Sequence, residues 1–446
     1  MSDFLFARSL MAMSLAFHII FATVGIGMPL LMAIAEGIYL RTKDAGYLDL
    51  SKRWARGTAI LFAVGAVSGT VLSFELGLLW PTFMEHAGPI IGMPFSLEGF
   101  AFFTEAIFLG IYLYGWQRIP PVAHWLAGVL VALSGAISGI FVVTANAWMN
   151  APTGFDLVDG ALVNIDPIAA MLNPASFHQV LHMTLAAYVA TGFGVAAVHA
   201  FFLLRDRTNS FHRQALGITL ALACVAIPLQ ILSGDLSARA VAELQPVKFA
   251  AMEGHYHTEA GAPLLIGGIP NDETMTTDYA LKIPYALSFM AAGDLQATVV
   301  GLEEFPRDEW PNSLLVHWSF DVMVGSGMAM LGLAGWSGWL WLRRRRLPDH
   351  PWLLKGLVAA GPLGFIAIET GWMVTELGRQ PWIIYGIMRT EEAVTPMPGL
   401  VVPFVTFLAL YIFLAIIVVF LLRRQFLETA QPSPRSTTSE RAHASS

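Results

Sequence analysis

Residues 361–382 read GPLGFIAIETGWMVTELGRQPW, an apolar stretch that contains two carboxylates and ends near a guanidinium. Glu369 and Glu376 lie inside the apolar run, and Arg379 follows Glu376 by three residues. A carboxylate in hydrocarbon is costly, so the pattern indicates a buried site for an ion, a metal or a charged cofactor, with Arg379 at the membrane edge. The alternative is a structural Glu376–Arg379 pair that fixes the end of a helix. Both interpretations make this stretch a membrane-spanning helix.

The composition of the whole chain is also that of a membrane protein. Its 446 residues are 56% hydrophobic and 13% charged, whereas about a quarter of the residues in soluble domains are charged. The single cysteine, Cys224, excludes a disulfide framework, a Cys-based zinc site and an iron–sulfur cluster. The net charge of −7 and the lack of a Gly-rich phosphate loop argue against nucleic acid as a partner.

About nine apolar runs are long enough to cross a bilayer. They cover residues 9–36, 56–80, 95–117, 123–148, 177–204, 214–235, 313–342, 354–377 and 400–422. The N-terminus lacks the basic region of a cleaved signal, so we interpret the first run as a retained helix. The sequence therefore predicts an all-α integral membrane protein of about nine transmembrane helices.

The charges of the connecting segments predict the orientation. The segments at 81–94 and 149–176 contain no Lys or Arg, whereas the alternate segments are basic, most clearly at 343–346. Because cytoplasmic loops are enriched in basic residues, we expect the N-terminus outside and the C-terminus in the cytoplasm. The chain is then divided into helices one to six, an external loop, helices seven to nine and a disordered cytoplasmic tail, at 1–235, 236–312, 313–427 and 428–446.

Potential metal ligands from five helices fall in the outer half of the predicted membrane. They are His18, Glu75, Met323, Glu376 and the pair His178 and His182. Each residue alone is more typical of core packing, but a shared depth favours a common site. A set of His, Met and Glu without Cys suits haem iron, and a His/Met pair suits an electron-transfer haem.

Two further groups of polar residues carry weaker signals. Glu98 and Glu105 are seven residues apart, so they share one helical face and could form a proton relay, to which His124 adds a group near the cytoplasmic end of the next helix. The alternative is polar helix packing. In the external loop, Lys248 and Glu253 offer a donor and a proton acceptor to a hydroquinone, although such a pair is usually solvated.

Taken together, these segments resemble subunit I of the cytochrome bd-type quinol oxidases, in the short-loop branch that includes the cyanide-insensitive oxidases. The resemblance spans nearly the whole chain. It rests on the segments at 16–18, 97–105, 145–150, 180–182, 234–235, 248–253, 283–286, 318–325 and 371–382.

The resemblance implies a haem arrangement. His182 and Met323 are implied as the axial pair of a low-spin haem b. His18 and Glu376 are implied as single axial ligands of two further haems, one of which reduces O2. The implied cofactors are two haems b and one haem d, or a further haem b in place of haem d.

The remaining roles also follow from the resemblance. Lys248 and Glu253 are implied at the quinol site, Trp372 and Arg379 beside the haem pair, and Arg8 near the haems. Glu98, Glu105 and His124 are implied on the cytoplasmic proton route. The chain departs from better-known members at Asp321, where they carry Arg; a carboxylate beside the low-spin haem should lower its midpoint potential.

The implied function is a terminal quinol oxidase in a bacterial cytoplasmic (inner) membrane. It would oxidise ubiquinol or menaquinol at the outer face and reduce O2 to water with cytoplasmic protons, generating a proton motive force without pumping. The implied partners are a second membrane subunit and a small single-helix subunit. A haem b quinol dehydrogenase and an ion-coupled transporter are the alternatives, and the lack of an internal repeat counts against the transporter.

Overall fold

The structure, a computed structural model, describes residues 3–347, 349–394 and 397–429. Over these residues, nine helical segments are long and apolar enough to cross a membrane, which confirms the predicted all-α membrane fold. They are α1 (Asp3–Thr42), α2 (Ala45–Leu79), α3 (Pro81–Tyr114), α4 (Pro121–Asn150), α6 (Ser176–Arg205), α7 (Ser210–Leu244), α10 (Ser313–Arg344), the pair α11 (Pro351–Ala360) and α12 (Leu363–Leu377), and α14 (Val401–Thr429). Of the predicted tail at 428–446, residues 430–446 lie outside the described residues.

The spanning helices are longer than the apolar runs that predict them. The sequence predicts a first span at 9–36, whereas α1 has 40 residues, and α7 continues to Leu244 rather than to residue 235. The prediction counts the roughly 20 residues that hydrocarbon requires, while helical hydrogen bonding continues through the polar flanks. The predicted run at 354–377 is interrupted at Gly361 and Pro362, because proline lacks an N–H and its ring clashes with the preceding turn.

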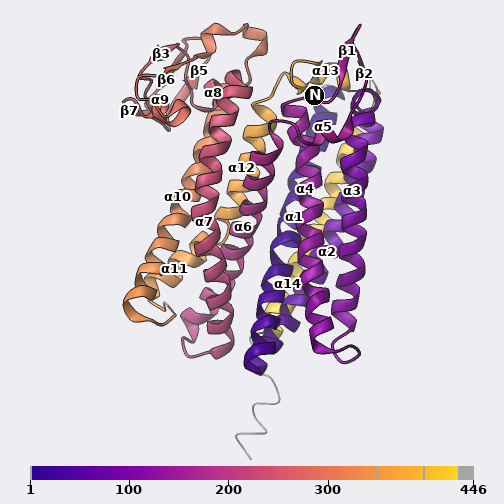
Figure 1. Ribbon diagram of the computed structural model, residues 1–446, viewed down its shortest axis with the longest axis vertical. Helices are drawn as coiled ribbons and strands as arrows, with labels where there is room; N and C mark the ends of the chain where they lie inside the picture. Colours follow the sequence, from indigo (N-terminus) through magenta and orange to yellow (C-terminus); the bar gives the residue numbers. More distant parts are fainter. Residues whose placement is uncertain (1–2, 348, 395–396, 430–446) are drawn as a thin grey trace, which may run out of the picture.

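The spanning helices form two neighbouring groups (Figure 1). The first consists of α1 to α4 with α14, and the second of α6, α7, α10, α11 and α12. The largest apolar core lies in the second group, between α6, α7, α10 and α11. Contacts of α6 with α1 and α4 join the two groups.

One end of the bundle carries the folded connections, and we call it the loop end (Figure 1). Over the first group these are β1 (Asp156–Val158), β2 (Ala161–Val163), α5 (Pro167–Met171), β9 (Trp382–Ile384), β10 (Met388–Arg389) and α13 (Thr390–Ala393). Over the second group they are α8 (Pro246–Met252), β3 (Glu259–Ala260), β4 (Leu264–Ile266), β5 (Ile269–Asn271), β6 (Thr276–Asp278), β7 (Leu281–Ile283), α9 (Ala286–Ala292), β8 (Thr298–Val299) and 3-10 turns at Leu302–Glu304 and Arg307–Glu309.

All strands pair in antiparallel two-stranded ladders. In the segment 246–312, β5 pairs with β6, β4 with β7, and β3 with β8, so the three ladders are nested. We call β3 to β8 the external ribbon. It lies beside the loop end of α7 and α10 (Figure 1).

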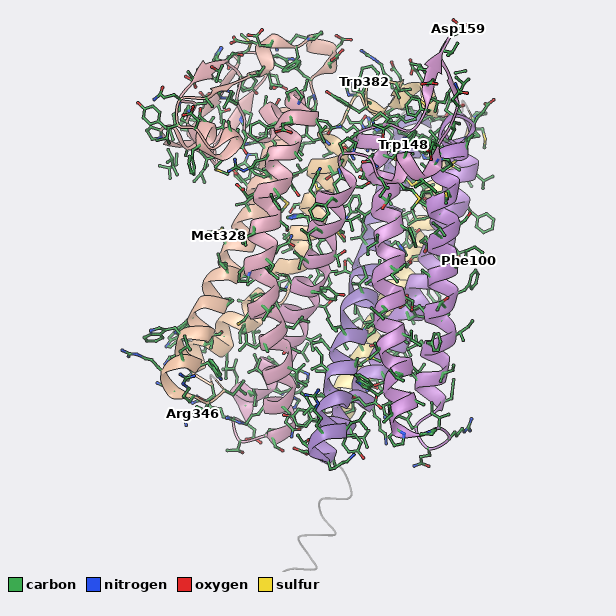
Figure 2. The ribbon with its side chains drawn as sticks, in the orientation of Figure 1. Phe100, Trp148, Asp159, Met328, Arg346 and Trp382 are labelled. Atoms are coloured by element: carbon green, nitrogen blue, oxygen red, sulfur yellow. The ribbon has the colours of Figure 1, made fainter. Side chains whose placement is uncertain are left out.

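The opposite end of the bundle, where α14 ends, we call the tail end. Arg346 lies at the tail end, whereas Trp148 and Trp382 lie at the loop end (Figure 2). Phe100 and Met328 project from the middle of the bundle, with exposed fractions of 72% and 52%. An apolar waist between polar ends is the surface that a bilayer requires.

Candidate functional site

His182 of α6 lies against a Ser–Gly pair on α7. Its Nδ1 is 3.0 Å from Oγ of Ser233, and that hydroxyl donates to the carbonyl of Gln230 at 2.9 Å. Because the serine hydrogen is already donated, Ser233 Oγ accepts the hydrogen on Nδ1, and Nε2 keeps its lone pair, which accepts a hydrogen bond from the amide of Gln230 at 3.1 Å. A Cβ added to Gly234 would lie 3.4 Å from the imidazole, so glycine leaves room beside the ring. His182 is thus held in the tautomer that a metal ligand needs.

His18 of α1 has the same arrangement with α2. Its Nδ1 is 3.0 Å from Oγ of Ser68, which donates to the carbonyl of Val64 at 3.0 Å. A Cβ added to Gly69 would lie 3.0 Å from the imidazole. The lone pair is therefore again on Nε2. We call these two arrangements the His18 cradle and the His182 cradle.

Met323 of α10 lies against another glycine. A Cβ added to Gly371 of α12 would lie 3.0 Å from its Sδ. Helices α7 and α12 each pack against both α6 and α10, so His182 and Met323 belong to one four-helix cluster. A thioether sulfur opposite an imidazole is a ligand set of electron-transfer haems.

Glu376 of α12 connects the two groups of helices. Its Oε1 accepts from Nδ2 of Asn146 on α4 at 2.6 Å, and its Oε2 accepts from Arg379 at 2.5 Å. The predicted Glu376–Arg379 pair is therefore present. Arg379 is only 2% exposed, and two of its nitrogens, Nε and NH1, have no hydrogen-bond partner among the described residues. Such buried, unsatisfied donors suit an anionic ligand group.

One face of α4 carries a row of polar contacts from the tail end to the loop end. His124 contacts Glu36 of α1, Gly135 lies against Glu105, Ser138 donates to Glu98, Asn146 donates to Glu376, and Asn150 accepts from Lys248. The spacings of 11, 3, 8 and 4 residues keep all five positions on one helical face, over about 39 Å. This row joins the predicted proton relay to the predicted quinol site.

At the tail end of the row, His124 and Glu36 are each 2% exposed. Nδ1 of His124 is 2.7 Å from Oε1 of Glu36, and Nε2 is 2.8 Å from the carbonyl of Tyr112. Farther along, Glu105 is 5% exposed, and a Cβ on Gly135 would lie 3.2 Å from its carboxylate. Ser138 Oγ donates to Glu98 at 3.2 Å. Both carboxylates therefore face α4, as the seven-residue spacing predicts.

Lys248 of α8 lies at the loop end of the row. Its Nζ donates to Oδ1 of Asn150 at 2.6 Å, and Nδ2 of Asn150 donates to Oδ1 of Asn146 at 3.0 Å. Lys248 is 4% exposed, and burial, with the nearby Arg379, lowers its pKa well below the ordinary value. A continuous chain of hydrogen bonds therefore runs from Lys248 through both asparagines to Glu376.

Glu253 follows α8 and is 1% exposed. Neither carboxyl oxygen has a hydrogen-bond partner in the part of the chain that the structure describes. Burial, and to a lesser extent the charge of Asp321, raises its pKa to about 8. A buried acceptor of this kind is suited to taking a proton from a bound ligand.

Asp321 and His317 of α10 hold the external loop beside Glu253. Oδ2 of Asp321 accepts from the N–H of Gly267 at 2.7 Å. His317 is fully buried, and its Nδ1 and Nε2 lie 2.8 Å and 2.9 Å from the carbonyls of Met252 and Gly267. Asp321, where the sequence analysis expects a departure from the family pattern, thus has a contact of its own with the external ribbon.

The other predicted residues lie at the loop end or between the two groups of helices. Arg8, in the second turn of α1, places its guanidinium 5.4 Å from the ring centre of Phe4. Trp372 of α12 packs with Ile19 and Ile368, and its buried Nε1 has no partner among the described residues. His178, 8% exposed, likewise has no described partner for either ring nitrogen.

Several residues of this site do not stand out in the sequence interpretation. They are Glu36, Ser68, Asn150, Ser233 and His317. Local signals exist for three of them: Ser68 and Ser233 each precede a glycine, and His317 and Asp321 have i,i+4 spacing. Glu36 and Asn150 can be recognised only through their partners on other helices.

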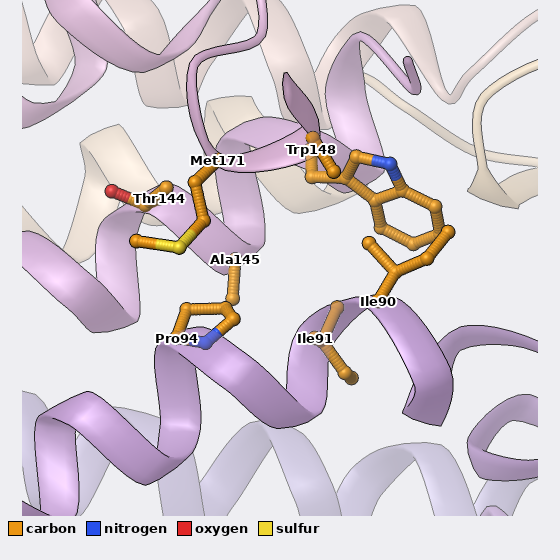
Figure 3. A pocket seen from close by; sticks show the side chains of 8 residues that line it. Ile90, Ile91, Pro94, Thr144, Ala145, Trp148 and Met171 are labelled. Carbon is orange, nitrogen blue, oxygen red and sulfur yellow. The ribbon is translucent and has the colours of Figure 1, made fainter. Parts of the chain in front are cut away.

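Over the described residues, no group of three or more His, Cys, Asp or Glu side chains could hold a metal ion by itself. The candidate ligands are therefore single residues, an arrangement that suits a metal held in a macrocycle. A small apolar pocket lies between α3, α4 and α5 (Figure 3). Ile90, Ile91, Pro94, Trp148 and Met171 line it with Thr144, Ala145 and Ala170, so it offers no acid or base.

Comparisons with known proteins cover nearly the whole chain. Residues 6–430 match the family described as cytochrome bd terminal oxidase subunit I. A putative cytochrome bd menaquinol oxidase subunit I of Bacillus subtilis is 39% identical, over 96% of this chain and 97% of the relative. Cytochrome bd-II ubiquinol oxidase subunit 1 of Escherichia coli is 31% identical, over 86% and 88%. The solved structure of bd oxidase from Geobacillus thermodenitrificans is 42% identical, with a TM-score of 0.89 over 96% of this chain and 98% of that one.

Proposed function

The chain belongs to the cytochrome bd terminal oxidase subunit I family, and from this premise we propose that it oxidises quinol at the loop end and provides the site of O2 reduction within the membrane. Family membership gives a multi-pass membrane subunit of a quinol oxidase that carries haem and works with a subunit II. The division of labour among its residues is our proposal.

The ligands fit haem. In both cradles the serine binds Nδ1, so the lone pair of the histidine is on Nε2. Glycines leave room beside His18, His182 and Met323. Two buried nitrogens of Arg379 have no hydrogen-bond partner among the described residues. His182 and Met323 would hold a low-spin haem b, and His18 and Glu376 the two others, a haem b and a haem d or a further haem b. When bound, the haems supply one-electron transfer and the iron at which O2 is reduced. Trp372, Arg379 and Arg8 would line these haems, with Arg379 directed at carboxylate substituents.

Quinol would bind between Lys248 and Glu253. Lys248 donates a hydrogen bond to a quinol oxygen, and Glu253 in its carboxylate form accepts a proton. The unpartnered, buried carboxyl of Glu253 supports this role, because a bound quinol would satisfy it. Of the two relatives named above, one is described as a putative menaquinol oxidase subunit and the other as a ubiquinol oxidase subunit, and we propose one of these two quinols as the substrate.

Protons for water formation would enter from the tail end along the polar row of α4. His124 and Glu36 receive the proton, and Glu105 and then Glu98 carry it toward the haems. The order of these contacts along one helix face supports the route. Quinol protons released at one face and protons taken up at the other generate a proton motive force without pumping.

The orientation completes the proposal. The basic run at 343–346 lies at the tail end, so we infer that the tail end and the C-terminus are cytoplasmic and that the loop end faces outward. The membrane would be the bacterial inner membrane. A small single-helix subunit could join subunit II.

The observation that carries the proposal is the unpartnered Glu253 beside α8, and its protonation gives the test. Because the pKa of Glu253 is raised to about 8, the carboxyl is protonated below that pH and cannot accept a proton, and it ionises above it. In stopped-flow mixing with quinol, the rate of low-spin haem reduction should rise as the pH passes through about 8. Glu253→Gln should abolish this rise and leave reduction by dithionite intact; an unchanged profile in the variant would contradict the assignment.

A further inference from the structure

The external ribbon carries an apolar face that is exposed in the structure. In the ladder of β4 and β7, Ile266 is opposite Leu281 and Leu264 is opposite Ile283, so these four side chains lie on one face. Leu281 is 65% exposed, Ile266 46% and Ile283 40%. An apolar patch on a segment outside the spanning helices indicates an interaction surface.

The height of this patch relative to the membrane is fixed by α10. The turn that follows Ile266 is held to that helix, because the N–H of Gly267 donates to Asp321 and its carbonyl lies 2.9 Å from Nε2 of His317. Asp321 is eight residues into α10, so the ribbon reaches about 12 Å along the helix rather than resting on its end.

The hydrocarbon boundary falls at the same level. The basic run at the tail end of α10 begins at Arg343. About 20 helical residues cross the roughly 30 Å of hydrocarbon, and counting back from Arg343 places the other boundary near Met323. Asp321 and the bound Gly267 therefore lie at the junction of hydrocarbon and headgroups.

The surface around the turn is continuous with the lipid-facing side of α10. On that helix, Val324 and Met328, which follow Asp321 toward the tail end, are 41% and 52% exposed. Tyr279, 93% exposed, lies between two residues that contact the turn, because a Cβ on Gly268 would be 2.8 Å from both the carbonyl oxygen of Asp278 and Cβ of Ala280. The strands of the ribbon lie outside the helix bundle, on the α10 side (Figure 1). Exposed tyrosine and aliphatic side chains at this depth suit the bilayer interface.

We propose that Ile266, Leu281, Ile283 and Tyr279 insert into the interfacial region of the lipid leaflet at the loop end and anchor the external loop to it. The anchor holds Glu253 beside the lipid from which an amphiphilic quinol arrives. The lipid contact stands by itself, whereas its effect on quinol capture rests on the proposed function.

The first experiment measures the depth of the patch directly. The oxidase complex is prepared with Cys224→Ala and Leu281→Cys, labelled with the fluorophore NBD, and placed in nanodiscs with and without lipids that carry a shallow spin label. We expect blue-shifted emission, quenching by the spin-labelled lipid and protection from aqueous iodide. The matched control, Glu273→Cys at the exposed tip of the β5–β6 hairpin, should be quenched by iodide alone.

Two results would overturn the proposal. Iodide quenching at position 281 equal to the control would place the patch in water. Protection from both quenchers would mean that a protein surface, from subunit II or a second complex, covers it.

A kinetic experiment tests the consequence for quinol capture. In proteoliposomes, Leu281→Glu with Ile283→Glu should raise the KM for quinol about fivefold and leave kcat unchanged, because access is impaired and the haems are not. Thr276→Glu, on an exposed polar position of the same ribbon, should change neither. An unchanged KM would contradict the role in capture, while the fluorescence result would still decide the lipid contact.

Discussion

The His18 and His182 cradles have the same construction and different surroundings. In both, a serine hydroxyl fixes the Nδ1 hydrogen and the following glycine leaves room beside the ring. His182 shares its helix cluster with the Met323 thioether, whereas one turn before His18 the hydroxyl of Ser14 donates to the carboxylate of Glu75 at 2.7 Å. The serine of each cradle thus fixes the tautomer of its histidine, and the neighbouring helices determine which other side chains lie near the ring. In the proposed function, this difference distinguishes the low-spin haem site, with two protein ligands, from one of the two sites with a single protein ligand.

Removing each histidine gives the largest expected effect and tests whether the two cradles serve different haems. His182→Ala should abolish the low-spin haem spectrum and retain the CO-sensitive one, because a single axial ligand does not give the low-spin state. His18→Ala should leave the low-spin band in place and remove one of the two other haems. His178→Ala is the matched control, since His178 lies one turn from His182. Loss of the low-spin band in the control, with its retention in His182→Ala, would reassign the ligand to His178.

Glu105→Gln tests the difference between the two haem sites, because it should slow O2 reduction without slowing the reduction of the low-spin haem. An amide keeps the size of the side chain but cannot carry a proton, so O2 reduction should slow by about 100-fold. Reduction of the low-spin haem by quinol, measured by stopped-flow absorbance, should be intact. Ser134→Ala on α4 is a control with a nearby polar change. An equal loss of both steps would contradict the proton-delivery role.

The serines of the cradles give a smaller effect. Ser233→Ala should weaken retention of the low-spin haem by about tenfold and leave the other haems in place. The reason is that the imidazole of His182 loses the hydrogen bond that orients it. Ser68→Ala should act on the His18 haem alone, and Ser→Thr at either position should restore retention. Haem content and spectra after purification in detergent measure both. If each variant lowered all haems equally, the serines would be general packing residues.

Asp321→Asn should give the smallest effect, a rise in the midpoint potential of the low-spin haem. A carboxylate near the haem favours its oxidised form, so removing the charge should raise the potential by a few tens of millivolts, where 59 mV corresponds to about 1.4 kcal/mol. The haem on the His18 side should not change. Redox titration followed by absorbance measures this, and a lowered low-spin potential would contradict the assigned effect of the charge.

The sequence predicts the fold well because its determinants are local. Apolar runs predict the nine spans that the described residues contain, and Gly361 and Pro362 are a local signal of the break that a single run at 354–377 overlooks. The i,i+3 spacing of Glu376 and Arg379 likewise predicts an ion pair that the structure contains. Helical periodicity therefore carries most of the information about which residues face inward.

The contacts between helices are less accessible to sequence. His124 and Glu36 are 88 positions apart, and Asn146 and Glu376 are 230 apart, so no local pattern joins them. The two serines resemble many small residues that pack transmembrane helices. Ser68 and Ser233 differ from such residues in that each hydroxyl donates to a carbonyl of its own helix and can therefore accept from a histidine.

The most direct test of the two-site account is a dithionite-reduced minus air-oxidised spectrum of the purified complex, recorded before and after addition of CO. The account predicts a low-spin b band that CO leaves unchanged, together with a high-spin species that CO shifts, absorbing in the red if the third haem is haem d. A b band with no CO response, or no haem bands at all, would contradict it.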